Sequence, residues 1–244
     1  MTASRVALFP TCVVDTVAPQ VGVSAVRVLR RAGYEVSVPR DATCCGQPAW
    51  NVGLAEEAAT VARTTLRALT DEASDVVCVP AGSCATMIRV TWPELFSIVG
   101  DPHARRLSEE LGSRVKEFSE LVAADPVSAS AEGVRVGYHH SCHMLRELGV
   151  REEPLDLLRR SGHEVVAWTG DDRCCGFGGL FSVKQPEISV AMADDKLDSL
   201  ASSGAEMLVG CDQSCLLHLE GRMARRGETM PVRHLAEVLD EAMP

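Results

Sequence analysis

Eight of the ten cysteines in this 244-residue chain recur in the same order, and at nearly the same spacing, in its two halves. Each half has a first cysteine, then 31 intervening residues, then two adjacent cysteines followed by glycine, and a last cysteine after 38 or 39 further residues. Side chains so far apart in sequence meet only if the fold brings them together, so this spacing constrains the fold strongly. The eight residues are Cys12, Cys44, Cys45, Cys84, Cys142, Cys174, Cys175 and Cys215.

The sequence around the cysteines repeats as well. The stretch LRRAGYEV at 29–36 matches LRRSGHEV at 158–165. We therefore predict a tandem duplication, with a first repeat at 1–125, a second repeat at 133–244, and packing of the two about a pseudo-twofold axis. The small and polar stretch AADPVSASAEG at 123–133 is typical of a linker between them.

The residue pattern predicts that both repeats are α/β units. Short runs rich in β-branched residues alternate with stretches that have apolar residues at helical spacing and end at glycine. This alternation favours a small parallel sheet with flanking helices in each repeat. The strands expected are 5–9, 34–39, 75–80, 134–139, 164–168 and 206–210, and the helices expected include 18–33, 54–69 and 152–162.

This topology predicts where the cysteines meet. Each cysteine position follows a predicted strand, and the carboxyl ends of parallel strands share one edge of a sheet. We therefore expect the four thiols of each repeat to converge and hold a metal centre. Gly46 and Gly176 directly follow the paired cysteines. There, glycine tolerates the positive φ of a sharp turn and lets backbone N–H groups approach a cofactor.

Several chemistries use clustered thiols. The N-terminus has no charged segment followed by a long apolar one, so we predict no secretory signal peptide and a cytoplasmic location. Cysteines there serve metal or redox chemistry more often than structural disulfides. An iron–sulfur cluster suits the long spacing and adjacent pairs better than zinc, whose ligands usually include close CxxC pairs. A structural zinc subunit and a thiol–disulfide reductase are the alternatives.

Composition excludes two other classes of protein. The formal net charge is −10 and no Lys/Arg-rich run is present, which argues against nucleic-acid binding. No apolar run approaches the roughly 20 residues of a membrane-spanning helix, so we predict no membrane span.

The chain resembles the cysteine-rich CCG-domain family, which includes a cysteine-rich component of heterodisulfide reductase and the iron–sulfur subunit of glycolate oxidase. The resemblance covers nearly the whole chain and is strongest for the members that serve lactate utilisation, which are similarly short and have two repeats. It is carried by CCGQPAWNVG (44–53), PAGSC (80–84), YHHSCH (138–143), CCGFGGLFSVKQPEIS (174–189), SCLLHLEGR (214–222) and RHLAEVL (233–239).

This resemblance implies a function and partners. The chain is expected to be an iron–sulfur redox subunit, an oxidoreductase component of a system that oxidises L-lactate to pyruvate. One [4Fe–4S] cluster per repeat, held by its four cysteines, is the simplest expectation. The implied partners are a ferredoxin-like iron–sulfur protein and a third lactate-utilisation protein, with lactate or another electron donor.

The chain departs from the heterodisulfide reductase branch in one respect. Those relatives have a CxxC in the last element, which gives each cluster a fifth thiolate, whereas Ala81 and Asp212 stand at the equivalent positions here. Asp212 and the nearby Cys211 are candidates for an extra ligand. Cys78 alternates within a predicted strand, so we expect it to be a core residue.

Other candidate site residues are histidines and one lysine. His139, His140 and His143 lie close to the first cysteine of the second repeat, where a histidine can bind metal or move a proton of an alcohol substrate. A hydrogen-bonding role near a turn is the alternative. Alternation from Tyr138 predicts that His140 faces the site. Lys184 is a candidate anchor for a substrate carboxylate.

Overall fold

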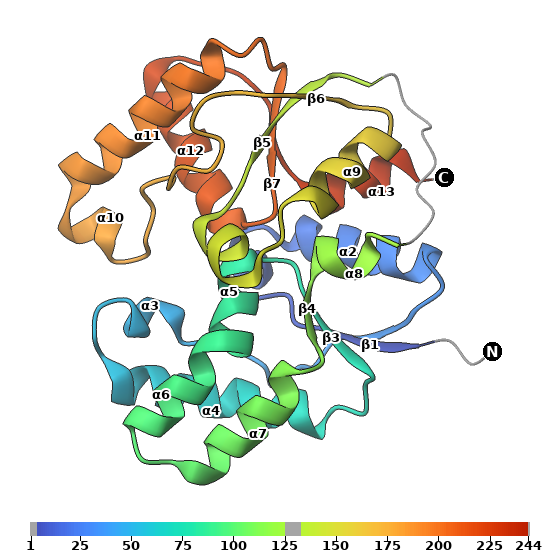
Figure 1. Cartoon of the computed structure of the whole chain (residues 1–244), viewed down its shortest axis with the longest axis vertical. Helices are drawn as coiled ribbons and strands as arrows, with labels where there is room; N and C mark the ends of the chain where they lie inside the picture. Colours follow the sequence, from blue (N-terminus) through green and yellow to red (C-terminus); the bar gives the residue numbers. More distant parts are fainter. Residues whose placement is uncertain (1–3, 125–132, 244) are drawn as a thin grey trace.

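The computed structural model describes residues 4–124 and 133–243 and contains two four-stranded parallel sheets. Their strand orders, β2-β1-β3-β4 and β6-β5-β7-β8, are the same when strands are numbered within each repeat. Figure 1 shows the sheets in separate halves of the molecule, one above the other. The predicted α/β class and tandem repeats are therefore confirmed. The linker predicted at 123–133 lies largely outside the described residues.

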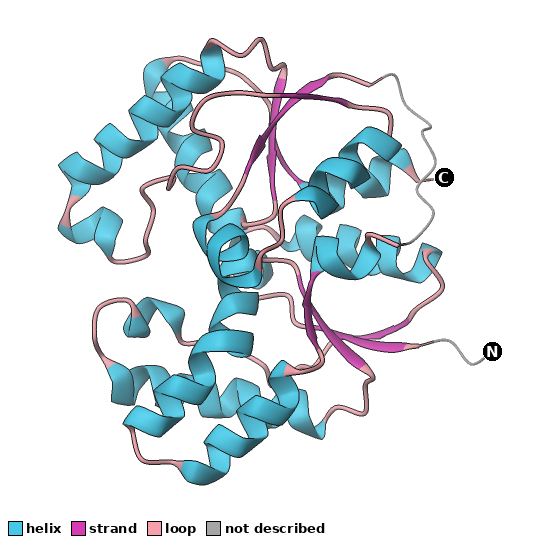
Figure 2. Cartoon of the chain, in the orientation of Figure 1, coloured by secondary structure: helices cyan, strands magenta, loops and turns pink. Residues whose placement is uncertain are grey.

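Six of the eight strands fall within predicted runs, and two were missed (Figure 2). The missed strands, β4 and β8, lead directly into a helix, whereas the equally short β2 and β6 lie within longer runs rich in β-branched residues. The strands are β1 (Arg5–Leu8), β2 (Glu35–Ser37), β3 (Val76–Val79), β4 (Val115–Glu117), β5 (Arg135–His139), β6 (Glu164–Val166), β7 (Met207–Gly210) and β8 (Val232–His234).

The helices follow the strands in the same order in both repeats, and the first repeat adds α7 before its last strand. In the first repeat they are α1 (Cys12–Val17), α2 (Pro19–Arg31), α3 (Gln47–Trp50), α4 (Ala55–Asp71), α5 (Gly82–Thr86), the π-helical turn η1 (Met87–Thr91), α6 (Trp92–Ile98), α7 (Pro102–Gly112) and α8 (Phe118–Val122). In the second they are η2 (Met144–Leu148), α9 (Glu152–Arg160), α10 (Phe181–Lys184), α11 (Pro186–Ala201), α12 (Gln213–Arg226) and α13 (Leu235–Ala242).

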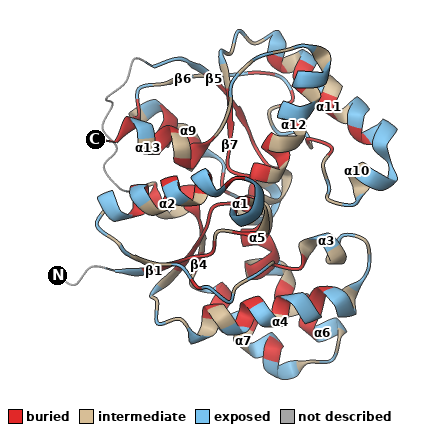
Figure 3. Cartoon of the chain, turned by 180° about the vertical axis from the view of Figure 1, so that it is seen from behind, coloured by how far each residue is buried: buried red, intermediate tan, exposed pale blue. Residues whose placement is uncertain are grey.

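The main hydrophobic core lies between the two sheets and belongs to both repeats. Leu8 and Cys78 of the first sheet contribute side chains to it, as do Tyr138 of the second sheet and Cys211, which directly follows β7. Figure 3 shows buried segments concentrated on the strands and on the helix faces that meet them. Cys78 is fully buried there, as its alternation in the sequence predicts. Within the described ranges, no helix has the length and apolarity needed to cross a membrane.

The two repeats use the same helix contacts twice. Helix α2 of the first repeat packs against α13 of the second, and α8 packs against α9. Because α2 corresponds to α9 and α8 to α13, these contacts are related by the predicted pseudo-twofold axis. Asp240 of α13 strengthens one of them by accepting a 3.0 Å hydrogen bond from Ser24 and pairing with Arg31 at 2.6 Å, both on α2.

The fourth strand of each sheet ends in a buried residue that caps the next helix. The Glu117 carboxylate accepts the Ser119 N–H at 2.7 Å, and Nδ1 of His234 accepts the Ala236 N–H at 3.1 Å. The other ring nitrogen of His234 lies 3.2 Å from the carbonyl oxygen of Pro80, in the other repeat. Complete burial raises the pKa of Glu117 to about 7, because desolvation disfavours the carboxylate.

Replacing Glu117 by glutamine should weaken the pH dependence of stability. The folded-state pKa of about 7 lies above the ordinary value of 4.5, so protonated Glu117 favours the folded state. This contribution to the free energy of unfolding is complete below about pH 4.5 and is lost as the pH rises to about 7. Between pH 5 and 8, the free energy of unfolding should fall by on the order of 2 kcal/mol more in the wild type than in Glu117→Gln. Urea unfolding of both proteins at several pH values measures this difference, and parallel profiles would contradict it.

Candidate metal centre

The four repeated cysteines of the first half meet at the carboxyl edge of its sheet. Cys12 begins α1 after β1, Cys44 and Cys45 lie in the loop after β2, and Cys84 lies in α5 after β3. The Sγ atoms of Cys12 and Cys44 are 3.5 Å apart, and those of Cys45 and Cys84 are 3.3 Å apart. The sequence thus folds four thiols from three separate segments into one group.

The second half builds the same group. Cys142 follows β5, Cys174 and Cys175 lie in the loop after β6, and Cys215 lies in α12 after β7. The side chain of Cys142 contacts Cys174, and that of Cys175 contacts Cys215, which repeats the pairing in the first half. All ten cysteines of the chain are free thiols.

The electrostatics of each group favour a bound cation. Hydrogen bonds from Cys12 and Cys45 lower the pKa of Cys44 to about 3, and the same arrangement lowers the pKa of Cys174 to about 2. The thiols of Cys12 and Cys45 have raised pKa values, because they donate to a neighbouring sulfur and are withdrawn from water. Four thiolates this close together would repel one another, and two of each group are buried, so all four can ionise together only if a metal supplies the compensating charge.

The turn after each cysteine pair packs tightly on a helix. Gly46 and Gly176 have φ values of +87° and +91°. A Cβ atom at Gly46 would lie 2.7 Å from the carbonyl oxygen of Ala58, and one at Gly176 would lie 2.5 Å from that of Ser189. The N–H of Gly176 also donates to Sγ of Cys174 at 3.4 Å. Glycine is therefore required both for the backbone conformation and for the close contact with α4 or α11.

A buried residue on the helix behind each loop holds the loop in place. In the first repeat, the Thr65 hydroxyl donates to the carbonyl oxygen of Cys44 at 2.9 Å. In the second, Nζ of Lys196 donates to the carbonyl oxygens of Gly170 at 2.5 Å and Arg173 at 2.7 Å. Burial lowers the pKa of Lys196 to about 8. The second loop is thus held by the Lys196 cation, and the first loop by the Thr65 hydroxyl at the equivalent position.

Both groups of thiols border one cavity of about 110 Å³ at the junction of the repeats. Seven of the eight repeated cysteines line it, and the eighth, Cys44, contacts Cys12. Helix α5 lies beside it, at the centre of the molecule in Figure 1. The polar side chains of the lining are those of Gln47, Asn51, Ser83, Ser141, His143, Asp212 and Ser214.

Only one of the two candidates for an extra ligand reaches the cavity. Asp212 borders it, and its carboxylate accepts the N–H of Ser83 in the other repeat at 2.9 Å and the Ser214 hydroxyl at 2.5 Å. Cys211 points the opposite way, into the shared core beside Tyr138, because neighbouring residues of an extended segment alternate between faces. Cys211 therefore lies apart from the metal group.

His143 borders the cavity, but His140 and Lys184 do not face it as expected. His140 packs edge-on against Tyr138 with ring centroids 4.8 Å apart, and lies 4.0 Å from the Asp171 carboxylate, so it does not face the thiols. His139 does: one of its ring nitrogens lies within 4.8 Å of the two buried sulfurs of the second group. Because Tyr138 faces the shared core and side chains alternate along a strand, His139 faces the thiols. Lys184 is exposed on α10, outside the cavity lining.

Comparison with known proteins agrees with this geometry. A model of the cysteine-rich domain family CCG matches residues 6–89 and 136–220, one copy in each repeat. The chain belongs to the CCG family. Two proteins named Lactate utilization protein A match it over nearly their whole length. The one from Exiguobacterium sp. is 40% identical and covers 98% of each chain, and the one from Geobacillus kaustophilus is 41% identical and covers 97% of this chain and 98% of its own.

A solved structure supports the fold alone. The crystal structure of a hypothetical protein from Helicobacter pylori matches the whole chain with a TM-score of 0.72 and 10% sequence identity. The chain spans 49% of that protein's length. This CCG-family member therefore shares its two-repeat architecture with a much longer and very dissimilar sequence.

Replacing Gly46 by alanine should destabilise the protein more than replacing Gly53 by alanine. Both glycines have positive φ, +87° and +82°, but a Cβ atom at Gly53 would meet no heavy atom within 4 Å. We expect about 1 kcal/mol for the backbone strain at Gly53 and about 2 kcal/mol or more at Gly46, where the clash with Ala58 adds to the strain. Urea unfolding measures both, and equal losses would show that the tight packing of the turn adds nothing.

Proposed function

We propose that the protein is an iron–sulfur redox subunit of a cytoplasmic system that oxidises L-lactate to pyruvate. The observation that carries the proposal is the pair of symmetrical four-thiol groups bordering one cavity. The lactate part rests on similarity to the two Lactate utilization proteins A along nearly the whole chain.

The donor set of each group fits an iron–sulfur cluster. Sulfur-only ligation from well-separated loops suits such clusters, and [4Fe–4S] is the simplest form for four thiolates. When bound, each cluster would supply one-electron transfer. The first cluster would be held by Cys12, Cys44, Cys45 and Cys84, and the second by Cys142, Cys174, Cys175 and Cys215.

The protein's own residues position the thiolates and influence their charge. Backbone N–H groups of Gly176 and Phe177 donate to the sulfurs of Cys174 and Cys175, each at 3.4 Å. Hydrogen bonds of this kind draw negative charge from the sulfur and are one means by which a protein sets the reduction potential of a cluster. Limited solvent exposure of Cys45 and Cys175, at 1% and 3%, acts on the potential as well.

Two centres suit the electron count of the reaction. Oxidation of L-lactate to pyruvate releases two electrons and two protons, and two one-electron centres on a shared cavity match that number. Electrons would leave the chain to a ferredoxin-like iron–sulfur protein, with a third lactate-utilisation protein completing the system.

Replacing Cys45 or Cys175 by serine should remove one cluster and leave the other. Each variant should retain about half of the iron and acid-labile sulfide of the wild type, because the two thiol groups share no cysteine. Protein prepared and reconstituted without oxygen provides the measurement, with electron paramagnetic resonance of the reduced protein. Cys78→Ala is the matched control, since Cys78 lies in the shared core, and it should keep the full metal content.

The same preparations separate the alternatives. Stoichiometric zinc without a redox-active signal would indicate a structural zinc subunit, and protein without metal would favour a thiol–disulfide enzyme. The lactate assignment has its own test: with both companion proteins present, L-lactate-dependent reduction of a dye should fall at least tenfold in each serine variant. Intact clusters without lactate-dependent reduction would contradict the substrate and leave the iron–sulfur assignment in place.

A further inference from the structure

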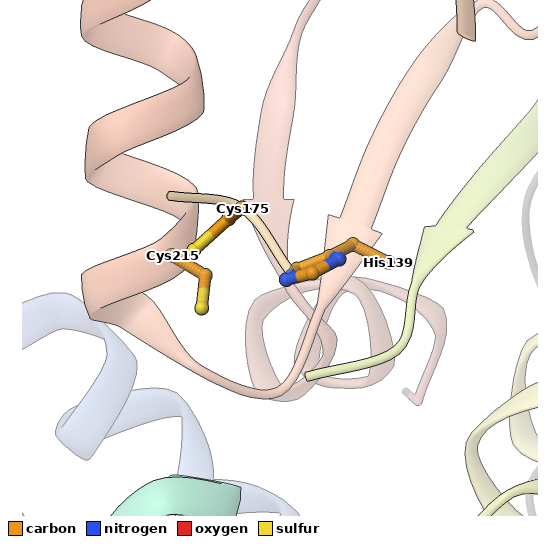
Figure 4. A group of neighbouring side chains, drawn as sticks. All are labelled: His139, Cys175 and Cys215. Carbon is orange, nitrogen blue, oxygen red and sulfur yellow. The ribbon is translucent and has the colours of Figure 1, made fainter. Parts of the chain in front are cut away.

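The second metal group contains a histidine that the first lacks. His139 lies at the end of β5, three residues before the first cysteine of its repeat, and Phe9 occupies the same position in the first repeat. One ring nitrogen of His139 and the Sγ atoms of Cys175 and Cys215 all lie within 4.8 Å of one another. Figure 4 shows this nitrogen turned towards the two cysteines.

The environment of His139 leaves its ring without a protein partner. The side chain is completely buried, and neither ring nitrogen has a well-formed hydrogen bond to the described residues. The nearby carbonyl oxygen of Asp171 already accepts the His140 N–H at 3.0 Å and Nζ of Lys196 at 3.1 Å. A buried polar group without a partner is unfavourable by about 1–3 kcal/mol, so such a group indicates a ligand that satisfies it.

A neutral imidazole has one ring nitrogen with a free lone pair, and this is the form in which histidine binds metals.

We propose that His139 is an additional, nitrogen ligand of the metal centre in the second repeat, on the side of that centre where Cys175 and Cys215 lie. This inference rests on the proposed iron–sulfur function. It makes the two centres chemically different, because the first repeat offers only the apolar ring of Phe9 at the equivalent position.

A second difference between the repeats concerns the charge beside the centre. Lys196 places a buried ammonium behind the second group, where the first repeat has the neutral Thr65. A nearby cation offsets the negative charge of a cluster and so raises its reduction potential, whereas the neutral imidazole of His139 adds no negative charge. The second centre should therefore have the higher reduction potential of the two.

The test uses reduced full-length protein in which only the second centre is present. In the Cys45→Ser background, protein labelled with ¹⁵N-histidine should show a histidine nitrogen hyperfine coupling by pulsed electron paramagnetic resonance. His139→Phe, which copies the first repeat, should lose this coupling. His143→Gln is the control: His143 borders the cavity, but its Nδ1 lies 2.8 Å from Glu147, so the coupling should persist.

Potentiometry gives an independent readout. His139→Cys supplies a thiolate in place of the imidazole, so it should keep the iron, lose the nitrogen coupling and lower the midpoint potential of the second centre. This variant also serves if His139→Phe does not fold, which circular dichroism would reveal.

Each outcome decides one claim. Normal iron and sulfide without a histidine coupling, or a coupling that survives in both His139 variants, would overturn the ligand assignment and leave the proposed function standing. A wild-type protein that binds no iron would overturn both.

Discussion

Mutual repulsion among closely grouped thiolates is the constraint on which the rest of the structure depends. Each repeat gathers four cysteines, two of them buried, and Cys44 and Cys174, which accept hydrogen bonds from the neighbouring thiols, have the lowered pKa values. Such a group is stable with all four thiolates only around a cation. The loops must therefore hold the sulfurs against their repulsion. The glycine turns and the helix residues behind them, Thr65 and Lys196, provide that rigidity.

The duplication turns two such groups into one site. Helices α2, α8, α9 and α13 pack between the sheets and bury a core common to both repeats. This packing fixes how the carboxyl edges of the two sheets face each other. At the junction the approach is close: a Cβ atom at Gly82 would lie 2.4 Å from that of Met144 and 2.8 Å from the hydroxyl of Ser141. The Asp212 carboxylate binds the N–H of Ser83 across the same junction, near the N-terminus of α5. This hydrogen bond gives Asp212 a structural role at the position where the heterodisulfide reductase relatives are expected to have a further cysteine.

Sequence reasoning could place the eight cysteines because their doubled spacing survives any local ambiguity, and parallel-sheet topology then brings them together. It could not find β4 and β8, which pair with β3 and β7 at the ends of the sheets and continue directly into helices. Sequence reasoning selected His140 over His139, because alternation assigns strand residues to two faces of the sheet but does not show which face lies beside the thiols. The shared core decides this: it takes Tyr138 to one face and leaves His139 on the other. Aligning the two repeats residue by residue would have revealed His139 opposite Phe9, and Lys196 opposite Thr65.

The two differences, His139 for Phe9 and Lys196 for Thr65, change neither the backbone nor the positions of the thiols. Both pairs of residues occupy equivalent places in the two repeats, so the architecture accepts either member, and the differences change only the charge and donor chemistry around the metal groups. Two identical centres would have equal potentials and no preferred direction of electron movement between them. A centre with an imidazole and a buried ammonium beside it would take electrons from one that has an aromatic ring and a hydroxyl in their place. In that arrangement, divergence of His139 and Lys196 from Phe9 and Thr65 gives a symmetrical duplication a direction for electron transfer across its shared cavity.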